Sequence, residues 1–126
     1  MPRTNLFVLS AGEVDDWAVG FGRRLASGET LTGTPKVTVH DVESPEAQYA
    51  GVTVSSIGRN ASTVNETDEN GTVLYAHAAN EAVEFRVTGA DSAVAGRYTL
   101  RAECSTTAGR SLVEPVPMRI QGPPET

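Results

Sequence analysis

The sequence is poor in several residue types that would mark particular classes of protein. Only one of its 126 residues is cysteine, and aromatic residues make up 6%. A single cysteine, Cys104, excludes an internal disulfide, and its place among alternating apolar residues predicts a small buried side chain. No apolar run approaches the roughly 18 residues that a membrane-spanning helix requires. We therefore expect no membrane association.

The beginning of the chain lacks the charged region, apolar core and cleavage site of a secretion signal. We therefore expect the protein to be made in the cytoplasm of the cell that produces it. Asn-x-Ser/Thr triplets begin at Asn60, Asn65 and Asn70. We expect them to be incidental, because glycosylation of such triplets requires the secretory route.

Positive charge is also scarce. The chain has 10 basic and 16 acidic residues, a net charge of -6, and Lys36 is its only lysine. This balance argues against binding to the phosphate backbone of a nucleic acid. The sequence also contains no glycine-rich phosphate loop, serine nucleophile elbow or metal-binding motif. We therefore expect neither enzymatic activity nor a cofactor, and we assign no catalytic, cofactor-binding or metal-binding residue.

What the sequence does contain is a repeated alternation of apolar and polar residues. It is clearest in three runs of the last third of the chain, 83–87, 98–104 and 116–120. A period of two places successive side chains on opposite faces of a sheet, so each run predicts a strand with one buried face. Three such strands close together indicate an antiparallel sheet packed on another layer.

Further strands are predicted at 13–21, 36–42, 51–57, 62–64 and 73–76, the last leading into the strand at 83. A helix over 15–25 is disfavoured because it would contain Gly20 and Gly22. Segments 43–51 and 65–71 are expected to be connections. The pattern predicts an all-β fold, an immunoglobulin-like antiparallel β-sandwich of about seven strands. The predicted core comprises Trp17, Phe21, Val37, Val39, Val52, Val54, Val83, Phe85, Tyr98 and Leu100.

The length is that of one domain. We divide the chain into an N-terminal arm or edge strand at 1–12, a sandwich at 13–121 and a flexible tail at 122–126. The arm contains Leu6, Phe7, Val8 and Leu9, an apolar run without polar alternation. We expect these four residues to contact another protein subunit, because exposed apolar surface gains free energy on burial. The alternative is an ordinary first strand of the sandwich.

Two kinds of metal site are weakly suggested. The acidic loop 68–71 lacks the alternating oxygen ligands and distant glutamate of a calcium loop, and an Asn-Gly turn explains it as well. His40 and His77 have no third ligand at a recognisable spacing for zinc. We expect both histidines to face solvent and the loop to be a plain turn.

Charged pairs along the chain suggest little chemistry. The acidic pairs Asp15-Asp16 and Asp41-x-Glu43 are of the type that hydrolases use, but nothing in the sequence raises the pKa of one member. The basic pair Arg23-Arg24 could bind an anion, although we favour a solvated or interface role.

The layout of the chain resembles that of the small fibre–tail adaptor proteins of tailed bacteriophages. An acidic–aromatic segment at 15–21 is followed by a Gly-Glu-Thr turn at 28–30. Later come the alternating strand 83–87, an Ala-Gly turn and Tyr-Thr-Leu strand at 95–100, and a Thr-Thr-x-Gly-Arg hairpin at 106–110. The resemblance covers about residues 13 to 121, with longer segments at 65–72 and 75–81.

The resemblance implies an immunoglobulin-like virion protein that joins a fibre, spike or tail part to the particle. Its partners would be portal or connector, tail or fibre subunits, in multiple copies about a symmetry axis. A capsid decoration or cement protein on the same fold is the first alternative. A cellular immunoglobulin-like binding module, or a fragment of a carbohydrate-binding protein, is the second. A sugar site would use exposed aromatics, for which Trp17, Tyr49 and Tyr75 are the candidates.

Overall fold

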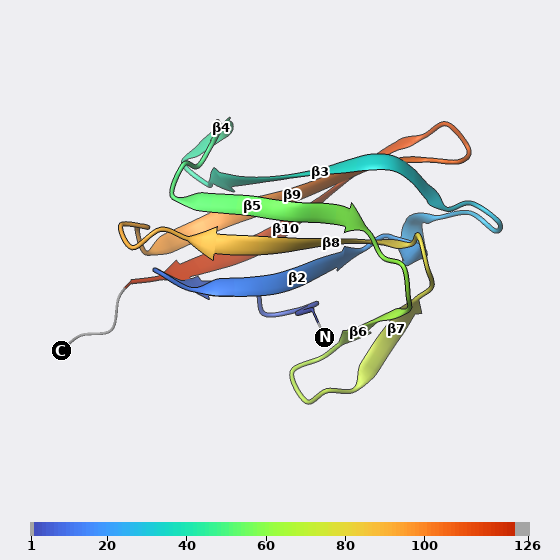
Figure 1. Ribbon diagram of the computed structural model, residues 1–126, viewed down its shortest axis with the longest axis horizontal. Helices are drawn as coiled ribbons and strands as arrows, with labels where there is room; N and C mark the ends of the chain where they lie inside the picture. Colours follow the sequence, from blue (N-terminus) through green and yellow to red (C-terminus); the bar gives the residue numbers. More distant parts are fainter. Residues whose placement is uncertain (1, 123–126) are drawn as a thin grey trace.

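The computed structural model describes residues 2–122, which form two packed β-sheets (Figure 1). The smaller sheet has three strands in the order β2-β8-β5, all antiparallel. In Figure 1 it lies over β9 and β10 of the second sheet. Its strands are β2 (Val14–Gly20), β5 (Val52–Arg59) and β8 (Ala82–Gly89).

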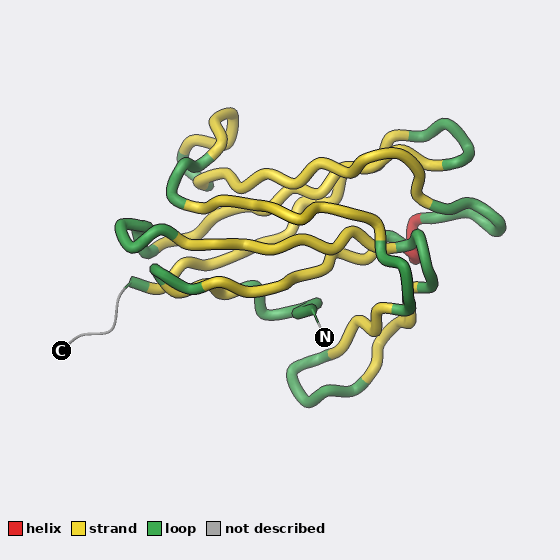
Figure 2. The backbone as a smooth tube through the Cα atoms, in the orientation of Figure 1, coloured by secondary structure: helices red, strands yellow, loops and turns green. Residues whose placement is uncertain are grey.

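The larger sheet has five strands in the order β1-β10-β9-β3-β4. All its pairs are antiparallel except the first, in which β1 runs parallel to β10. Loops gather at the two ends of the sandwich (Figure 2). The strands are β1 (Val8–Ser10), β3 (Leu31–Asp41), β4 (Ser44–Gln48), β9 (Gly96–Thr106) and β10 (Ser111–Gln121).

A separate two-stranded hairpin projects from the sandwich between β5 and β8 (Figure 1). It consists of β6 (Val64–Thr67) and β7 (Val73–His77). The helical part of the described chain is the 3-10 turn η1 (Gly22–Arg24). Within residues 2–122 no helix is long and apolar enough to cross a membrane.

The predicted fold class is confirmed: the chain is an all-β, immunoglobulin-like sandwich. A local feature supports it. The hydroxyl of Tyr98, near the start of β9, donates a hydrogen bond of 2.7 Å to the carbonyl of Val94. This is the tyrosine corner of immunoglobulin-like domains, in which a tyrosine hydroxyl fixes the corner that precedes its strand. Burial of the phenol is the main cause that raises the pKa of Tyr98.

The core follows the predicted alternation. Nine of the ten predicted core residues are buried, and Val54 is half-buried and packs against the others. Cys104 is also buried, and its thiol donates to the carbonyl of Thr32 at 3.3 Å. Burial raises the pKa of this thiol. Each alternating run thus contributes one face to a single core.

The strands differ from the predicted set in three places. The described chain has ten strands rather than about seven. Strand β4 occupies the segment expected to be a connection, and every one of its residues is exposed, so it carries no apolar alternation. Strand β6 extends to Thr67, and β7 pairs with it instead of leading into β8.

The N-terminal segment crosses from one sheet to the other. Arg3 bridges β2, since its amide donates to Asp16 and its carbonyl accepts from Ala18, both at 2.8 Å. A few residues later, β1 pairs with the end of β10. Segment 2–12 is therefore fastened to both sheets of the sandwich. Of the expected tail, residues 123–126 lie outside the described part of the chain.

For two of the four residues predicted to form an interface, the structure shows a different place. Phe7 and Leu9 are buried in the domain's own core, and the Phe7 ring packs edge-on against Trp17 with centroids 5.2 Å apart. Leu6, by contrast, is 53% exposed, and Val8 is half-buried on the outer face. The run alternates after all. Because both kinds of position hold apolar residues, the sequence hid the alternation.

A pair of substitutions tests this division of the arm. Phe7→Ala should lower the free energy of unfolding by about 3–5 kcal/mol, the usual cost of a large-to-small change in a core. Leu6→Ala, the matched control, should change it by no more than about 0.5 kcal/mol. Chemical denaturation followed by tryptophan fluorescence measures both. A loss below about 1 kcal/mol in Phe7→Ala would contradict the assignment of this ring to the core.

Candidate functional site

The acidic loop 68–71, which was expected to be a plain turn, forms a turn between β6 and β7. Asp68 Oδ1 accepts hydrogen bonds of 2.9 Å from the amides of Asn70 and Thr72. Its oxygen therefore closes the β6–β7 turn. Among the described residues, no group of three or more His, Cys, Asp or Glu side chains could hold a metal ion.

The two histidines were expected to face solvent, and this prediction was wrong. His40 is 8% exposed, and its ring contacts the Thr38 hydroxyl at 2.8 Å and the Ala47 carbonyl at 2.9 Å. The hydrogen bond to Ala47 shows why the prediction failed. Strand β4, which the sequence did not reveal, folds back over this part of β3.

His77 is 1% exposed and engages both of its ring nitrogens. Nδ1 accepts a hydrogen bond of 3.1 Å from the amide of Gly22, so the proton of the neutral ring is on Nε2. Nε2 donates to the Glu66 carboxylate at 3.0 Å. Burial opposes the charge of Glu66, but hydrogen bonds from His77 and Arg23 outweigh it and lower its pKa. The pair resembles a catalytic dyad, yet the imidazole has no nitrogen left for a substrate.

The His77 ring holds the β6–β7 hairpin on the sandwich. A Cβ atom at Gly20 would meet this ring at 2.0 Å, and one at Gly22 would meet it at 2.7 Å. The two glycines therefore make room for the hairpin.

The two aspartates of the acidic pair Asp15-Asp16 form separate ion pairs. Asp16 binds Arg86 at 2.9 Å, and this hydrogen bond is the main cause that lowers the pKa of Asp16. Asp15 accepts from Arg3 and from the Trp17 indole. Each member of the Asp15–Asp16 pair thus has its own structural partner.

The two arginines of the basic pair also have partners. Arg23 binds Glu66 at 2.8 Å and lies over the Tyr75 ring. Arg24 binds Glu114 at 3.2 Å. The remaining acidic pair forms a local turn, in which Asp41 accepts from the Glu43 amide at 2.9 Å. These contacts favour a structural role for Arg23 and Arg24 over an anion site.

Two of the motifs behind the phage resemblance meet in space. Glu29, from the Gly-Glu-Thr turn, is 6% exposed and accepts from the Thr106 hydroxyl at 2.5 Å. Arg110 of the Thr-Thr-x-Gly-Arg hairpin donates to both oxygens of Glu29, at 2.5 and 3.0 Å. The hydrogen bonds from Arg110, followed by that from Thr106, lower the pKa of Glu29 to about 2. We call this cluster of three residues the Glu29 clamp.

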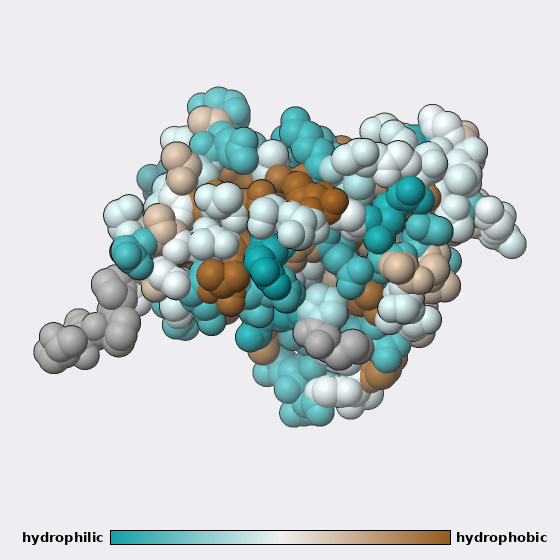
Figure 3. All heavy atoms as spheres, viewed as in Figure 1, coloured by the Kyte–Doolittle hydropathy of each residue, from teal (hydrophilic) through white to brown (hydrophobic). Residues whose placement is uncertain are grey.

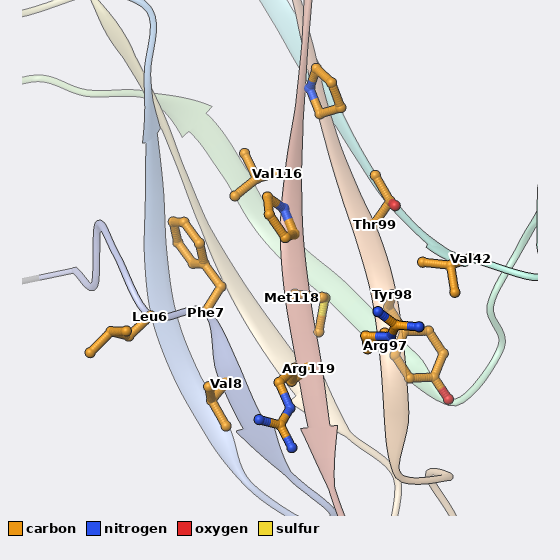
Figure 4. Close-up of a pocket in the computed structure, with 12 residues that line it drawn as sticks. Leu6, Phe7, Val8, Val42, Arg97, Tyr98, Thr99, Val116, Met118 and Arg119 are labelled. Atoms are coloured by element: carbon orange, nitrogen blue, oxygen red, sulfur yellow. The ribbon is translucent and has the colours of Figure 1, made fainter.

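The surface feature best suited to binding is a hollow of about 660 Å³ on the five-stranded sheet (Figure 4). It lies where β1, β10 and β9 run side by side, and volumes of this size are typical of binding pockets. We define the groove by the outward residues that line it: Leu6, Val8, Val42, Arg97, Thr99, Pro115, Pro117 and Arg119.

Two arginines lie side by side on the floor of the groove. Arg97 and Arg119 are direct neighbours across the β9–β10 ladder, and Val8 is the next residue in the same row (Figure 4). Within residues 2–122 neither arginine forms a salt bridge. Like charges opposite each other destabilise a sheet. This pair therefore offers two donors to an acidic group from outside the chain.

Two prolines shape the edge of the groove. Strand β1 covers only residues 119–121 of β10, so Pro115 and Pro117 lie on an open stretch of edge. The Arg119 amide donates outward to the carbonyl of Phe7, and by alternation the ring nitrogens of both prolines face the same way. Proline has no amide hydrogen, so this edge is a poor acceptor of an added strand. The groove is suited to side chains.

The sequence pointed to this surface only in part. Of the four residues assigned to an interface, Leu6 and Val8 line the groove with outward side chains. Phe7 reaches the hollow from the core, and Leu9 is buried in the core. Arg97 and Arg119 were not singled out, because residues 22 positions apart become neighbours only through strand pairing. Of the candidate sugar-binding aromatics, Trp17 is fully buried, and Tyr49 and Tyr75 are half-buried.

No protein-family model matches the chain, and no curated protein matches it. Among solved structures, the periplasmic chaperone SfaE is similar, with a TM-score of 0.55 and 7% identity over 91% of this chain and 52% of SfaE. A family 123 glycoside hydrolase from Clostridium perfringens matches with a TM-score of 0.45 and 9% identity, over 95% of this chain and 23% of the hydrolase. The chain thus spans about half the length of SfaE, and the likeness to SfaE bears on the fold alone.

The Glu29 clamp generates a prediction about acid stability. A carboxyl whose pKa is lower in the folded than in the unfolded chain stabilises the fold above its unfolded value. The ordinary value is 4.5, so this stabilisation should be present at neutral pH and lost as the pH falls from about 5 towards 2. We expect Glu29→Gln to be less stable than the native chain at pH 7.

The same variant should also show a flatter decline of the thermal midpoint across this pH range. Circular dichroism at several pH values measures both effects. Glu46→Gln is the matched control, because Glu46 is exposed on β4, and its profile should follow that of the native chain. A Glu29→Gln profile as steep as the native one would refute the role given to the clamp.

Proposed function

We propose that the chain is a structural virion protein of a tailed bacteriophage. It acts as an adaptor that joins a fibre, spike or tail component to the particle through protein–protein contacts. Its partners are portal or connector, tail or fibre subunits, and it enters the virion from the host cytoplasm. The phage assignment comes from the resemblance in sequence layout. The contacts with Glu29 support it, because they give two separate parts of that layout one shared structural role.

The groove is the observation that carries the binding role. A function is argued from a site rather than from a fold, and the groove combines exposed apolar side chains with two arginines that lack a salt bridge within residues 2–122. Apolar surface with arginine is typical of protein interfaces. The net charge of -6 disfavours nucleic acid as the partner.

The proposal is tested by complementation. A phage from which this gene has been deleted is grown in cells that supply the tagged protein, and the purified particles are probed for it. We expect the protein to sediment with particles and immunogold label to gather at the tail or its attachment vertex. Label spread over the whole shell would favour capsid decoration instead. Absence from particles would overturn the phage assignment.

A substitution in the groove tests the binding role in the same assay. Val8→Asp removes apolar surface from the groove and places a carboxylate beside Arg119, the neighbour of Val8 in the same row, where it competes with an acidic partner. We expect the thermal midpoint of the variant to stay within a few degrees of the native value. Its incorporation into particles should fall at least about tenfold. Val14→Asp is the control, because Val14 is 55% exposed and lies outside the groove. Equal incorporation of both variants would exclude the groove.

A further inference from the structure

We infer that the occupant of the groove is the β6–β7 hairpin of a second copy of this chain, so that copies associate head to tail. The inference gives the proposed interaction surface a specific partner and rests on the proposal that the groove binds protein. It does not depend on the phage assignment, because it is tested with the purified chain alone.

The hairpin carries a second exposed apolar surface, in addition to the groove. Val73 is 52% exposed and Leu74 is 54% exposed, both on β7 close to the turn. In the space-filling view, a hydrophobic patch lies beside hydrophilic residues in this projecting region (Figure 3). Apolar side chains that are more than half exposed gain free energy when a partner buries them.

The charges of the hairpin and the groove are opposite. The turn next to Val73 contains Asp68 and Glu69, and neither forms a salt bridge within the described range 2–122. The groove supplies Arg97 and Arg119, side by side on neighbouring strands. Two carboxylates beside two aliphatic side chains therefore face two guanidinium groups beside Leu6, Val8 and Pro117. Such complementarity fixes both the partner and the register of an interface.

The way the hairpin is held favours it as the inserted element. The His77 ring fixes its base against Gly20 and Gly22, and Asn65 and Thr67 bind the N-terminal segment through Thr4. Strand β6 is therefore held as far as Thr67, and the turn beyond it projects from the sandwich (Figure 1). A pre-organised projection loses little conformational entropy on binding.

A second copy fits better than an unrelated acidic protein. Copies with a net charge of -6 repel one another in general, so a basic patch facing an acidic hairpin directs association to one geometry. The open edge beside the groove carries Pro115 and Pro117, which disfavours strand addition and leaves side-chain insertion as the mode. Contact between two different surfaces repeats from copy to copy, which closes a ring when the rotation between copies allows it.

The first measurement is sedimentation of the purified full chain over a range of concentrations at low salt. We expect association that strengthens with concentration and weakens as salt is added, because salt screens the pairing of the arginines with the carboxylates. A chain that remains monomeric up to its solubility limit at low salt would overturn the inference.

Charge reversal then tests the groove. Arg119→Glu should weaken association by about tenfold or more, because it places like charges in contact. Lys36→Glu is the matched control, since it changes the net charge equally. Lys36 lies opposite Glu103 in the β3–β9 ladder, outside the groove. Equal effects of the two variants would show that only net charge matters, and the inference would fail.

Mixing two defective variants tests the head-to-tail arrangement itself. Val73→Ser/Leu74→Ser removes the apolar surface of the hairpin and leaves the groove intact, whereas Arg119→Glu does the reverse. Each variant alone should be monomeric, with a circular dichroism spectrum and thermal midpoint like those of the native chain. Their mixture should form a one-to-one dimer, because it contains one intact groove and one intact hairpin. A mixture that stays monomeric, or a hairpin variant that still associates, would refute the pairing.

Discussion

Trp17 is the residue that joins the N-terminal segment to the three-stranded sheet. Its ring is fully buried and packs edge-on against Phe85 on the neighbouring strand and Phe7 from the crossing segment. Its indole nitrogen donates to Asp15, which also binds Arg3 at the start of that segment. Because one side chain contacts both this sheet and the crossing segment, the same packing that fills the core also helps to place β1 beside β10. The groove exists only because β1 is held there.

The Glu29 clamp fixes the other end of the sandwich by a different means. A buried carboxylate is costly unless it is fully paired, and Glu29 is paired with Arg110, Thr106 and the amide of Ala26. The contacts join the turn before β3 to the turn between β9 and β10, so strands that are far apart in the sequence keep their register. The clamp thus stabilises the sheet whose outer face carries the groove.

Buried and exposed polar groups of the described chain have different roles. Buried polar groups hold structural elements together, as in the hydrogen bonds of His77 with Glu66 and of His40 with Thr38. Arg97 and Arg119 in the groove and Glu69 at the turn of the hairpin, which form no salt bridge within residues 2–122, are at the surface. This division underlies the role in assembly that we propose.

The sequence by itself determined the sandwich, because a core between two sheets imposes a period of two that remains visible in runs such as 83–87 and 98–104. It could not reveal strands without a buried face, so exposed β4 was missed, and with it the burial of His40. It also could not divide the run 6–9, since apolar residues occupy both faces. Only the tertiary structure decided these points. Strand pairing brings Arg97 beside Arg119 and Glu29 beside Arg110 across long sequence separations, and such contacts leave no local pattern in the sequence.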